Sequence, residues 1–340
     1  MRKTLDFLQK KVPLYVLFLI LAVSGVAIAV LSLSKISSQP LQAPAIAIGP
    51  HFSMDLIRTN RLKLVRPLVL ADVKSESPAL SGIKNDVASF INQMKSEGKA
   101  RDVSVYFRRL NTGDWFAIDG SNVYNPASMV KVAILLTVLK MAENDPKLLE
   151  RRIFLEAHQE GYAQNISSDP LETGKEYTVR KLLEQMITYS DNDATVLLQG
   201  MMDMPTFNQL FSTLKLEMPD FSKEYFIGVT DFSKIFRSLY NATYLNERYS
   251  EYALELLTRS TYSDGIVAGI GTRIPVAHKF GERVVGGTAQ LHEIGIVFQG
   301  EDPYLLGVMT SGSDLRELAG IIKSIAMRVH QNTSRLSAAS

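Results

Sequence analysis

Cysteine is missing from all 340 residues of this chain. Its absence excludes disulfides, thiol nucleophiles, thiolate zinc sites and iron–sulfur clusters. The chain also lacks a strong excess of one charge, because its formal net charge is only +2, and we therefore expect no nucleic-acid partner. Its five histidines show no metal-ligand spacing, and the sequence contains no glycine-rich phosphate loop. Accordingly, neither a metal nor an organic cofactor is predicted.

Charge is absent from residues 12–34, and most of this run is apolar. About 20 such residues in a helix cross a hydrocarbon core of roughly 30 Å. Four cations lie in residues 1–11, whereas Lys35 is the only cation between the run and Arg58, which favours a cytoplasmic tail at 1–11. The alternative is a cleaved signal peptide, because Ala27–Ala29 fits an A-x-A pattern. We prefer an uncleaved single-pass anchor in the lipid bilayer, with the rest of the chain outside the membrane.

Residues 35–80 contain five prolines and little helical periodicity, which predicts a linker and lead-in segment. Within this segment, residues 61–70 are apolar enough to dock on the following domain as an extended strand. The main domain is predicted at residues 81–330, with a short tail at residues 331–340.

The hydrophobic pattern of the main domain predicts a helix, two strands, a helical block, three strands and a final helix. The ranges that carry this pattern are 83–94, 103–107, 115–118, 126–257, 276–280, 294–298, 304–310 and 315–329. This order indicates an α+β fold in which terminal helices flank an antiparallel sheet and the helical block forms a subdomain. Neither strand group suffices for a stable sheet, so the two groups must pair across the helical block.

Ser128 and Lys131 form a Ser-x-x-Lys pair at the start of a strongly apolar helix, where Asn125 and Pro126 supply a cap and a first-turn proline. Helical spacing places the amine of Lys131 on the same face as the Ser128 hydroxyl. A buried lysine has a lowered pKa and can take the proton from a serine hydroxyl. The pair alone favours a simpler interpretation, a surface lysine beside a helix-start serine, because short motifs often arise by chance.

Two further segments favour a catalytic role for Ser128 and Lys131 over this simpler interpretation. Ser190–Asn192 lies between two predicted helices, Lys279–Gly281 lies in a predicted strand, and each motif occurs once. Together with Ser128 and Lys131 they resemble the Ser-x-x-Lys, Ser-Asp-Asn and Lys-Thr-Gly elements of class A β-lactamases and penicillin-binding proteins. The likeness spans about residues 81–330 and extends to the order of the helices and strands.

The resemblance implies a β-lactamase/transpeptidase-like fold and a role for each matching residue. Ser128 would attack an amide carbonyl and become acylated, while Lys131 manages the proton. Ser190 would relay that proton to the leaving nitrogen. Asn192 would bind the side-chain amide of the substrate, and Lys279 would supply positive potential toward a substrate carboxylate.

By the same resemblance, Gly281 and Glu282 belong to the substrate-binding strand. The backbone N–H groups of Ser128 and Glu282 would then form the oxyanion hole. Asp191 would orient its loop.

Two departures from the family pattern bear on the activity. Phe280 replaces a small hydroxyl residue that normally helps to hold a carboxylate. The Glu-x-x-Leu-Asn signature of the deacylating glutamate is missing, because neither Glu217 nor Glu224 continues with that pattern.

The resemblance therefore implies a serine hydrolase that acts on β-lactam or cell-wall peptide amides and deacylates slowly. Two alternatives stay open, a non-catalytic module that binds peptidoglycan with the same fold and an amidase for a small amino acid amide. His278 and His292 fit satisfied groups at strand edges better than site residues.

Overall fold

A five-stranded antiparallel sheet organises the part of the chain that the computed structural model describes, residues 54–59, 66–158, 170–219 and 223–339. Its strand order is β4-β3-β11-β10-β9, and its members are β3 (Asp102–Arg109), β4 (Trp115–Ile118), β9 (Val276–Val285), β10 (Thr288–Val297) and β11 (Tyr304–Gly312). Strand β3 pairs with β11, so the first and last strand groups join across the helical block, which confirms the predicted α+β arrangement.

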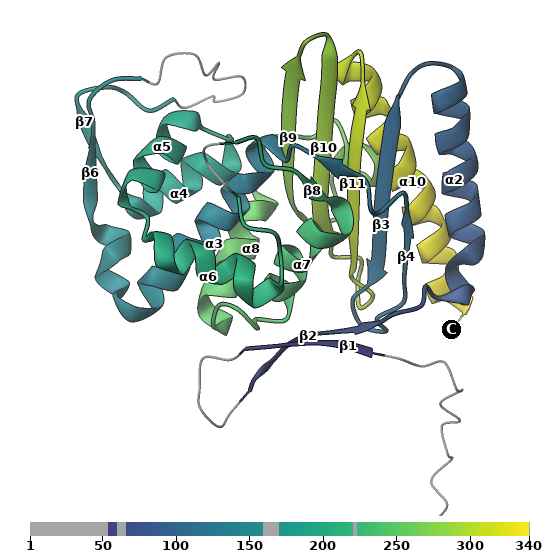
Figure 1. Ribbon diagram of the computed structural model, residues 1–340, viewed down its shortest axis with the longest axis horizontal. Coiled ribbons are helices and arrows are strands. Elements are labelled where there is room, and N and C mark those ends of the chain that lie inside the picture. Colours follow the sequence, from purple (N-terminus) through teal and green to yellow (C-terminus); the bar gives the residue numbers. More distant parts are fainter. Residues whose placement is uncertain (1–53, 60–65, 159–169, 220–222, 340) are drawn as a thin grey trace, which may run out of the picture. The chain divides into compact units, whose positions relative to one another are not determined.

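Helices α2 (Ser81–Ser96) and α10 (Leu315–Ala339) cover one face of this sheet (Figure 1). Each helix buries an apolar stripe at helical spacing, and the stripes include Ile83, Val87, Ile91, Leu318, Ile322 and Ile325. Helix α2 ends where Gly98 adopts a φ of +72°, a left-handed conformation that glycine takes without strain. The predicted terminal helices are thus present on the same side of the sheet.

The helical block packs against the opposite face. Alternate residues of β11 point to opposite sides, so Leu306 and Val308 join the cluster beneath α2 and α10, whereas Leu305 and Met309 join the core of the helical block. The helices of the block are α3 (Lys131–Asn144), α4 (Val179–Thr188), α5 (Asn192–Met201), α6 (Met204–Leu214), α7 (Val229–Tyr240) and α8 (Glu247–Thr258). A short helix α9 (Ile266–Ile270) follows them before the chain enters β9.

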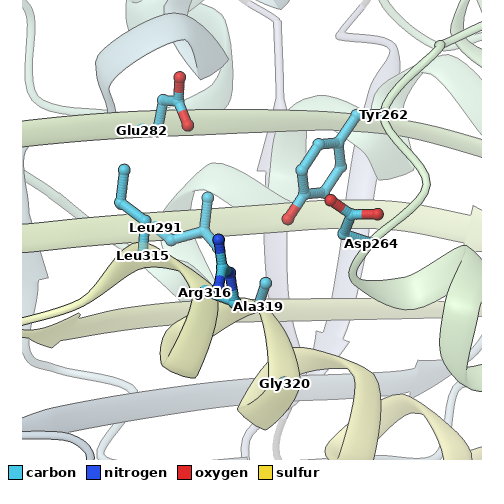
Figure 2. A pocket seen from close by; sticks show the side chains of 8 residues that line it. All are labelled: Tyr262, Asp264, Glu282, Leu291, Leu315, Arg316, Ala319 and Gly320. Atoms are coloured by element: carbon cyan, nitrogen blue, oxygen red, sulfur yellow. The ribbon is translucent and has the colours of Figure 1, made fainter.

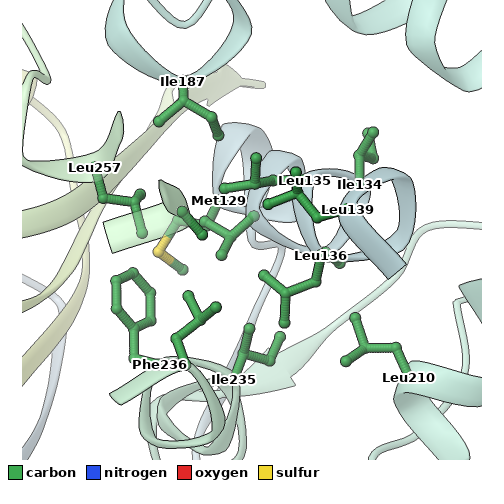
Figure 3. Close-up of a cluster of buried hydrophobic side chains, with 14 of the residues drawn as sticks. Met129, Ile134, Leu135, Leu136, Leu139, Ile187, Leu210, Ile235, Phe236 and Leu257 are labelled. Carbon is green, nitrogen blue, oxygen red and sulfur yellow. The ribbon is translucent and has the colours of Figure 1, made fainter. Parts of the chain in front are cut away.

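Helix α3 is the centre of the helical block, because nearly all of its side chains are buried. Figure 3 shows its leucines and isoleucine surrounded by side chains from the other helices. The labelled members of this cluster are Met129, Ile134, Leu135, Leu136, Leu139, Ile187, Leu210, Ile235, Phe236 and Leu257. A helix held on every side is a rigid support for the residues at its N-terminal end.

The helical block also contains two pairs of short strands. They were not predicted from the sequence. They are β5 (Val123–Tyr124) with β8 (Ile227–Gly228), and β6 (Arg152–Leu155) with β7 (Lys175–Thr178). Each is only two to four residues long, which is too short for a period-two pattern to be recognised.

The segment before residue 81 differs from the predicted linker. Strands β1 (Met54–Arg58) and β2 (Leu68–Val73) form an antiparallel pair, so the predicted strand at residues 61–70 overlaps β2 only at its end. Asp72 of β2 accepts hydrogen bonds from Arg108 and Arg237 at 2.9 and 3.0 Å. Because these two guanidinium groups belong to β3 and α7, β2 is part of the domain, which agrees with the predicted docking of this segment although the strand lies later in the chain.

The C-terminal end also differs from the predicted tail. Helix α10 continues to Ala339, and Thr333 is fully buried with its hydroxyl bonded to the Val329 carbonyl. Strand β10 begins at Thr288 instead of residue 294, because Gly286 and Gly287, both at positive φ, make a tight turn that lengthens the β9–β10 hairpin.

A membrane anchor at residues 12–34 lies outside the described residues. Within the described ranges, none of the helices combines the length and the apolar character that a membrane span requires.

Candidate active site

The turn that carries Ser128 precedes α3. The sequence predicted an α-helix from Ser128, but residues Ala127–Val130 form a 3-10 turn and α3 begins at Lys131. Ala127 has a φ of +47°, a strained conformation for a residue with a side chain. The Asn125 side chain stabilises it, because its Oδ1 accepts a hydrogen bond from the Ala127 amide at 3.0 Å. Ser128 is half-buried in this turn.

Strand β9 passes directly against this turn at Gly281. A methyl group on Gly281 would lie 2.5 Å from the Pro126 carbonyl oxygen and 3.1 Å from the amide nitrogens of Ser128 and Met129. All three contacts are with backbone atoms, which cannot rotate away. Gly281 therefore allows the close approach that brings Ser128 to the open edge of the sheet.

His292 of β10 fixes the same turn from beneath. Its Nδ1 accepts a hydrogen bond from the Thr310 amide at 3.1 Å, so its Nε2 carries the proton and donates to the Asn125 carbonyl at 3.1 Å. Burial lowers the pKa of His292 to about 4, so the ring stays neutral. His292 is not an edge group as the sequence suggested, because β10 lies inside the sheet. We assign it as a positioning residue for the serine turn.

Lys131 lies at the first position of α3 and is 3% exposed. Its ammonium donates to the Ser190 carbonyl at 2.5 Å, to Asn192 Oδ1 at 2.7 Å and to Ser190 Oγ at 3.2 Å. Burial lowers the pKa of Lys131 to about 7, while the negative charge of Asp191 opposes this shift. A substantial fraction of this amine is therefore neutral at pH 7 and able to accept a proton.

The loop between α4 and α5 presents Ser190 to both lysines. Ser190 has a φ of +57°, and Asp191 caps α5 by accepting a hydrogen bond from the Ala194 amide at 2.8 Å. The Thr195 hydroxyl also donates to the Asp191 carbonyl at 2.6 Å. This cap holds the strained loop in place, which agrees with the orienting role expected for Asp191.

Lys279 of β9 reaches Ser190 from the opposite side. Its ammonium donates to Ser190 Oγ at 3.0 Å and to the Phe280 carbonyl at 2.8 Å. Lys279 has no exposed surface, and burial together with the nearby charge of Lys131 lowers the pKa of its amine well below the ordinary value. One hydroxyl, that of Ser190, thus lies within hydrogen-bond distance of two buried amines.

The structure brings Lys131, Ser190, Asn192 and Lys279 into one hydrogen-bonded cluster, with Ser128 one helical turn before Lys131. Gly281 lies against the Ser128 turn. Three segments far apart in the sequence therefore meet where an amine of lowered pKa, two hydroxyls and backbone amides are available. Such a set can activate a hydroxyl nucleophile and pass its proton on.

The side chain of Glu282 lies apart from the cluster of Lys131, Ser190, Asn192 and Lys279. Alternation along β9 sends its side chain to the α10 face, where it lines a cavity with Tyr262 and Arg316. Its backbone still follows Gly281 along the open edge of β9. The sequence analysis missed Tyr262 and judged His292 to be a strand-edge group, because a contact between distant segments leaves no local pattern.

None of the acidic residues considered after Ser190 is placed as a deacylating base within the described residues. Glu217 is exposed, Glu224 forms an ion pair with Arg283 of β9, and Asp220 lies outside the described residues. Among the described residues, no group of three histidine, aspartate or glutamate side chains is arranged to hold a metal ion.

Comparisons with known proteins identify the family and the fold. The family model described as "Beta-lactamase enzyme family" matches residues 84–333. A mutant of PBP-A in an acyl-enzyme complex with penicillin G has a TM-score of 0.62 and 20% sequence identity, over 75% of this chain and 97% of that one. A β-lactamase from Sphaerobacter thermophilus DSM 20745 has a TM-score of 0.62 and 20% identity, over 75% and 98% of the two chains.

The extended-spectrum β-lactamase TLA-3 has a TM-score of 0.66 and 15% identity, over 74% of this chain and 98% of that one. At such low identity these structures show that the fold is shared. No curated protein sequence matches the chain.

Proposed function

This chain belongs to the β-lactamase enzyme family, and on that premise we propose that its Ser128 forms an acyl-enzyme with β-lactam or cell-wall peptide amides. The observation that carries the proposal is the position of Ser190 Oγ, 3.2 Å from Lys131 Nζ and 3.0 Å from Lys279 Nζ. The junction between two helices does not require a hydroxyl that is hydrogen-bonded to two buried amines. Such an arrangement suits a proton relay.

In the proposed acylation, neutral Lys131 takes the proton from Ser128 Oγ as that oxygen attacks the substrate carbonyl. A new Oγ–C bond forms, and the C–N bond of the amide then breaks. The proton passes from Lys131 through Ser190 Oγ to the leaving nitrogen, so the leaving group departs as a neutral amine. The lowered pKa of Lys131, about 7, supports this role because about half of the amine is neutral at pH 7.

The developing oxyanion would be stabilised by the backbone N–H groups of Ser128 and Glu282. Two observations support this pairing. The Ser128 amide lies beside Gly281, and Glu282 is the next residue on the open edge of β9. Removing a donor from such a site in other enzymes costs about 2.7–4 kcal/mol of transition-state stabilisation.

Asn192 and Lys279 would orient the substrate and the relay. Asn192 accepts from Lys131 through its Oδ1, which leaves the amide NH₂ group to bind a carbonyl of the substrate. Lys279 would hold the Ser190 hydroxyl in place through its 3.0 Å hydrogen bond.

Deacylation is proposed to be slow. The Glu-x-x-Leu-Asn signature is missing from the sequence, and the described alternatives, Glu217 and Glu224, are exposed or paired with Arg283. An acyl-enzyme without a base for its attacking water persists, so the adduct should accumulate.

Intact mass spectrometry of the folded chain with benzylpenicillin tests the proposal. We expect the mass to rise by one molecule of penicillin over time, and we expect the Ser128→Ala variant to stay unmodified. Ser121→Ala, which changes an exposed serine before the same turn, is the matched control and should react like the wild type. An adduct that survives Ser128→Ala would contradict the assignment of the nucleophile.

We further propose that residues 12–34 anchor the enzyme in the cell membrane with the catalytic domain outside. The support is the uncharged apolar run and the excess of cations before it. The full chain should remain in the membrane fraction after extraction with alkaline carbonate. Recovery of a shortened chain in the soluble exported fraction would instead indicate a cleaved signal peptide.

A further inference from the structure

The interactions of the Lys279 ammonium are all with groups of the protein: two hydrogen bonds and one contact with an aromatic ring. Two of its hydrogens are used by Ser190 Oγ and the Phe280 carbonyl, at 3.0 and 2.8 Å. The nitrogen also lies 4.2 Å from the centroid of the Phe280 ring, a distance typical of a cation–π contact. Because Lys279 has no exposed surface, a substrate group can reach this nitrogen only if side chains around it move, and the ring of Phe280 is one of them.

Phe280 is held in this position by Tyr262. The two rings stack with centroids 4.2 Å apart and an interplanar angle of 16°, and both side chains are more than nine-tenths buried. The loop that carries Tyr262 is tied to the end of α4, because the Thr261 amide and hydroxyl both donate to the Thr188 carbonyl, at 3.0 and 3.1 Å. Since Thr188 lies just before Ser190, this aromatic pair closes the side of the cluster where Lys279 meets Ser190.

The surroundings of Tyr262 are unfavourable to an anion. Tyr262 lines a cavity of about 350 Å³ together with Asp264 and Glu282 from one side and Arg316 of α10 from the other (Figure 2). The buried carboxylate of Glu293 also acts on Tyr262, so the charged groups around it comprise three carboxylates and one guanidinium. Burial, and after it the nearby carboxylates, raise the pKa of Tyr262, so its hydroxyl stays neutral.

Within the proposed function, on which this inference rests, we propose that Phe280 and Tyr262 select acyl donors that carry no carboxylate beside the scissile amide. A carboxylate in this place would have to give up its water without gaining the Lys279 ammonium, which is costly for a charged group. An uncharged ester or amide in the same place has no such cost, because it carries no charge that must lose its water. Phe280 is thus the specificity-determining residue, and Tyr262 positions it.

Benzylpenicillin and its methyl ester form a matched pair, because they share the reactive ring amide and differ only in the charge of the carboxyl group. In both, the Ser128 Oγ–C bond forms, the ring C–N bond breaks, and the ring nitrogen takes the proton that leaves Ser128. The rate at which each compound forms the adduct is measured by intact mass. It is then divided by the rate at which hydroxide hydrolyses the ring amide of the same compound, which corrects for the difference in intrinsic reactivity. For the wild type we expect the ester to react faster than the acid by about tenfold or more.

Phe280→Thr should uncover the Lys279 ammonium and restore a hydroxyl donor. We expect it to raise the rate with the free acid by about tenfold or more and to leave the rate with the ester nearly unchanged. Phe90→Thr, which removes an aromatic ring from the distant helix α2, is the matched control and should keep the wild-type ratio. If Phe280→Thr does not fold, Tyr262→Leu removes the stacking partner and should shift the ratio in the same direction.

The outcomes separate this inference from the proposed function. A wild-type enzyme that reacts faster with the free acid than with the ester would overturn the inference while leaving Ser128 as the nucleophile. An unchanged ratio in both folded variants would overturn it as well. If neither compound modifies Ser128 in any variant, the proposed function itself fails.

Discussion

Replacing Lys131 with methionine is expected to slow the acylation of Ser128 by a factor of about 10²–10⁴, the range that a positioned general base contributes. Methionine has a similar length and fits a buried position, so the change removes the amine and leaves the packing of α3 largely intact. Acylation by benzylpenicillin methyl ester, followed by intact mass, gives the rate. The fold of the variant is checked by circular dichroism.

The pH dependence of the wild type supplies a second measure of the same role. Burial lowers the pKa of Lys131 to about 7, so the amine is mostly protonated and inactive below that pH and mostly neutral above it. The acylation rate should therefore rise about tenfold from pH 6 to pH 8 and then level off. Lys131→Met should lose this rise, because its side chain does not titrate.

Lys140 on the same helix is the matched control, since its ammonium is bonded to Glu143 and to the Tyr244 carbonyl, away from the cluster. Lys140→Met should keep both the rate, within about twofold, and the pH profile. A wild-type rate in Lys131→Met, or a flat wild-type profile, would show that another group takes the proton.

Gly281→Ala is expected to reduce acylation by a factor of about 10² or more, because a displacement of the reacting groups by about 1 Å has an effect of this size. The added methyl group would lie 2.5 Å from the Pro126 carbonyl oxygen. Strand β9 and the turn that carries Ser128 must then move away from each other. Overpacking of this kind also lowers the free energy of unfolding by about 1–3 kcal/mol, which a denaturant titration measures.

Gly200→Ala is the matched control for this substitution. Gly200 lies near the end of α5, and its added methyl group would meet no atom within 4 Å. In a helix this change should be neutral or slightly stabilising, by about 0.4–1 kcal/mol, and acylation should be unaffected. Wild-type acylation in Gly281→Ala would mean that the close approach of β9 to the Ser128 turn is not needed for activity.

Much of the fold was readable from the sequence where a long element has one buried face. The apolar spacing of α2 and α10 was sufficient, because burial on one side imposes a period. The alternation of apolar side chains also indicated strand β3, although both of its faces are buried. Elements that depend on distant partners were not readable. Strand β2 is held by Asp72 between Arg108 and Arg237, and neither arginine is near it in the sequence.

For the candidate site too, the sequence predicted some features and only the structure showed the others. Its motif residues were located correctly on a helix start, a loop and a strand, but the sequence did not show that α3 starts at Lys131 instead of Ser128. That difference arises because the positive φ of Ala127 and the hydrogen bond from His292 to Asn125 hold the serine turn apart from the helix. Both are tertiary constraints.

By itself the sequence determined the α+β class, the order of the main elements and the positions of the three motifs from which the site is proposed. It did so because motifs and hydrophobic periods are local properties of the chain. Only the tertiary structure decided that two amines share Ser190 Oγ, that the Phe280 ring lies beside the Lys279 amine and that Tyr262 stacks on Phe280. The physical reason is that burial and mutual distance set the pKa and the accessibility of a charged group, and both arise only when distant segments pack together.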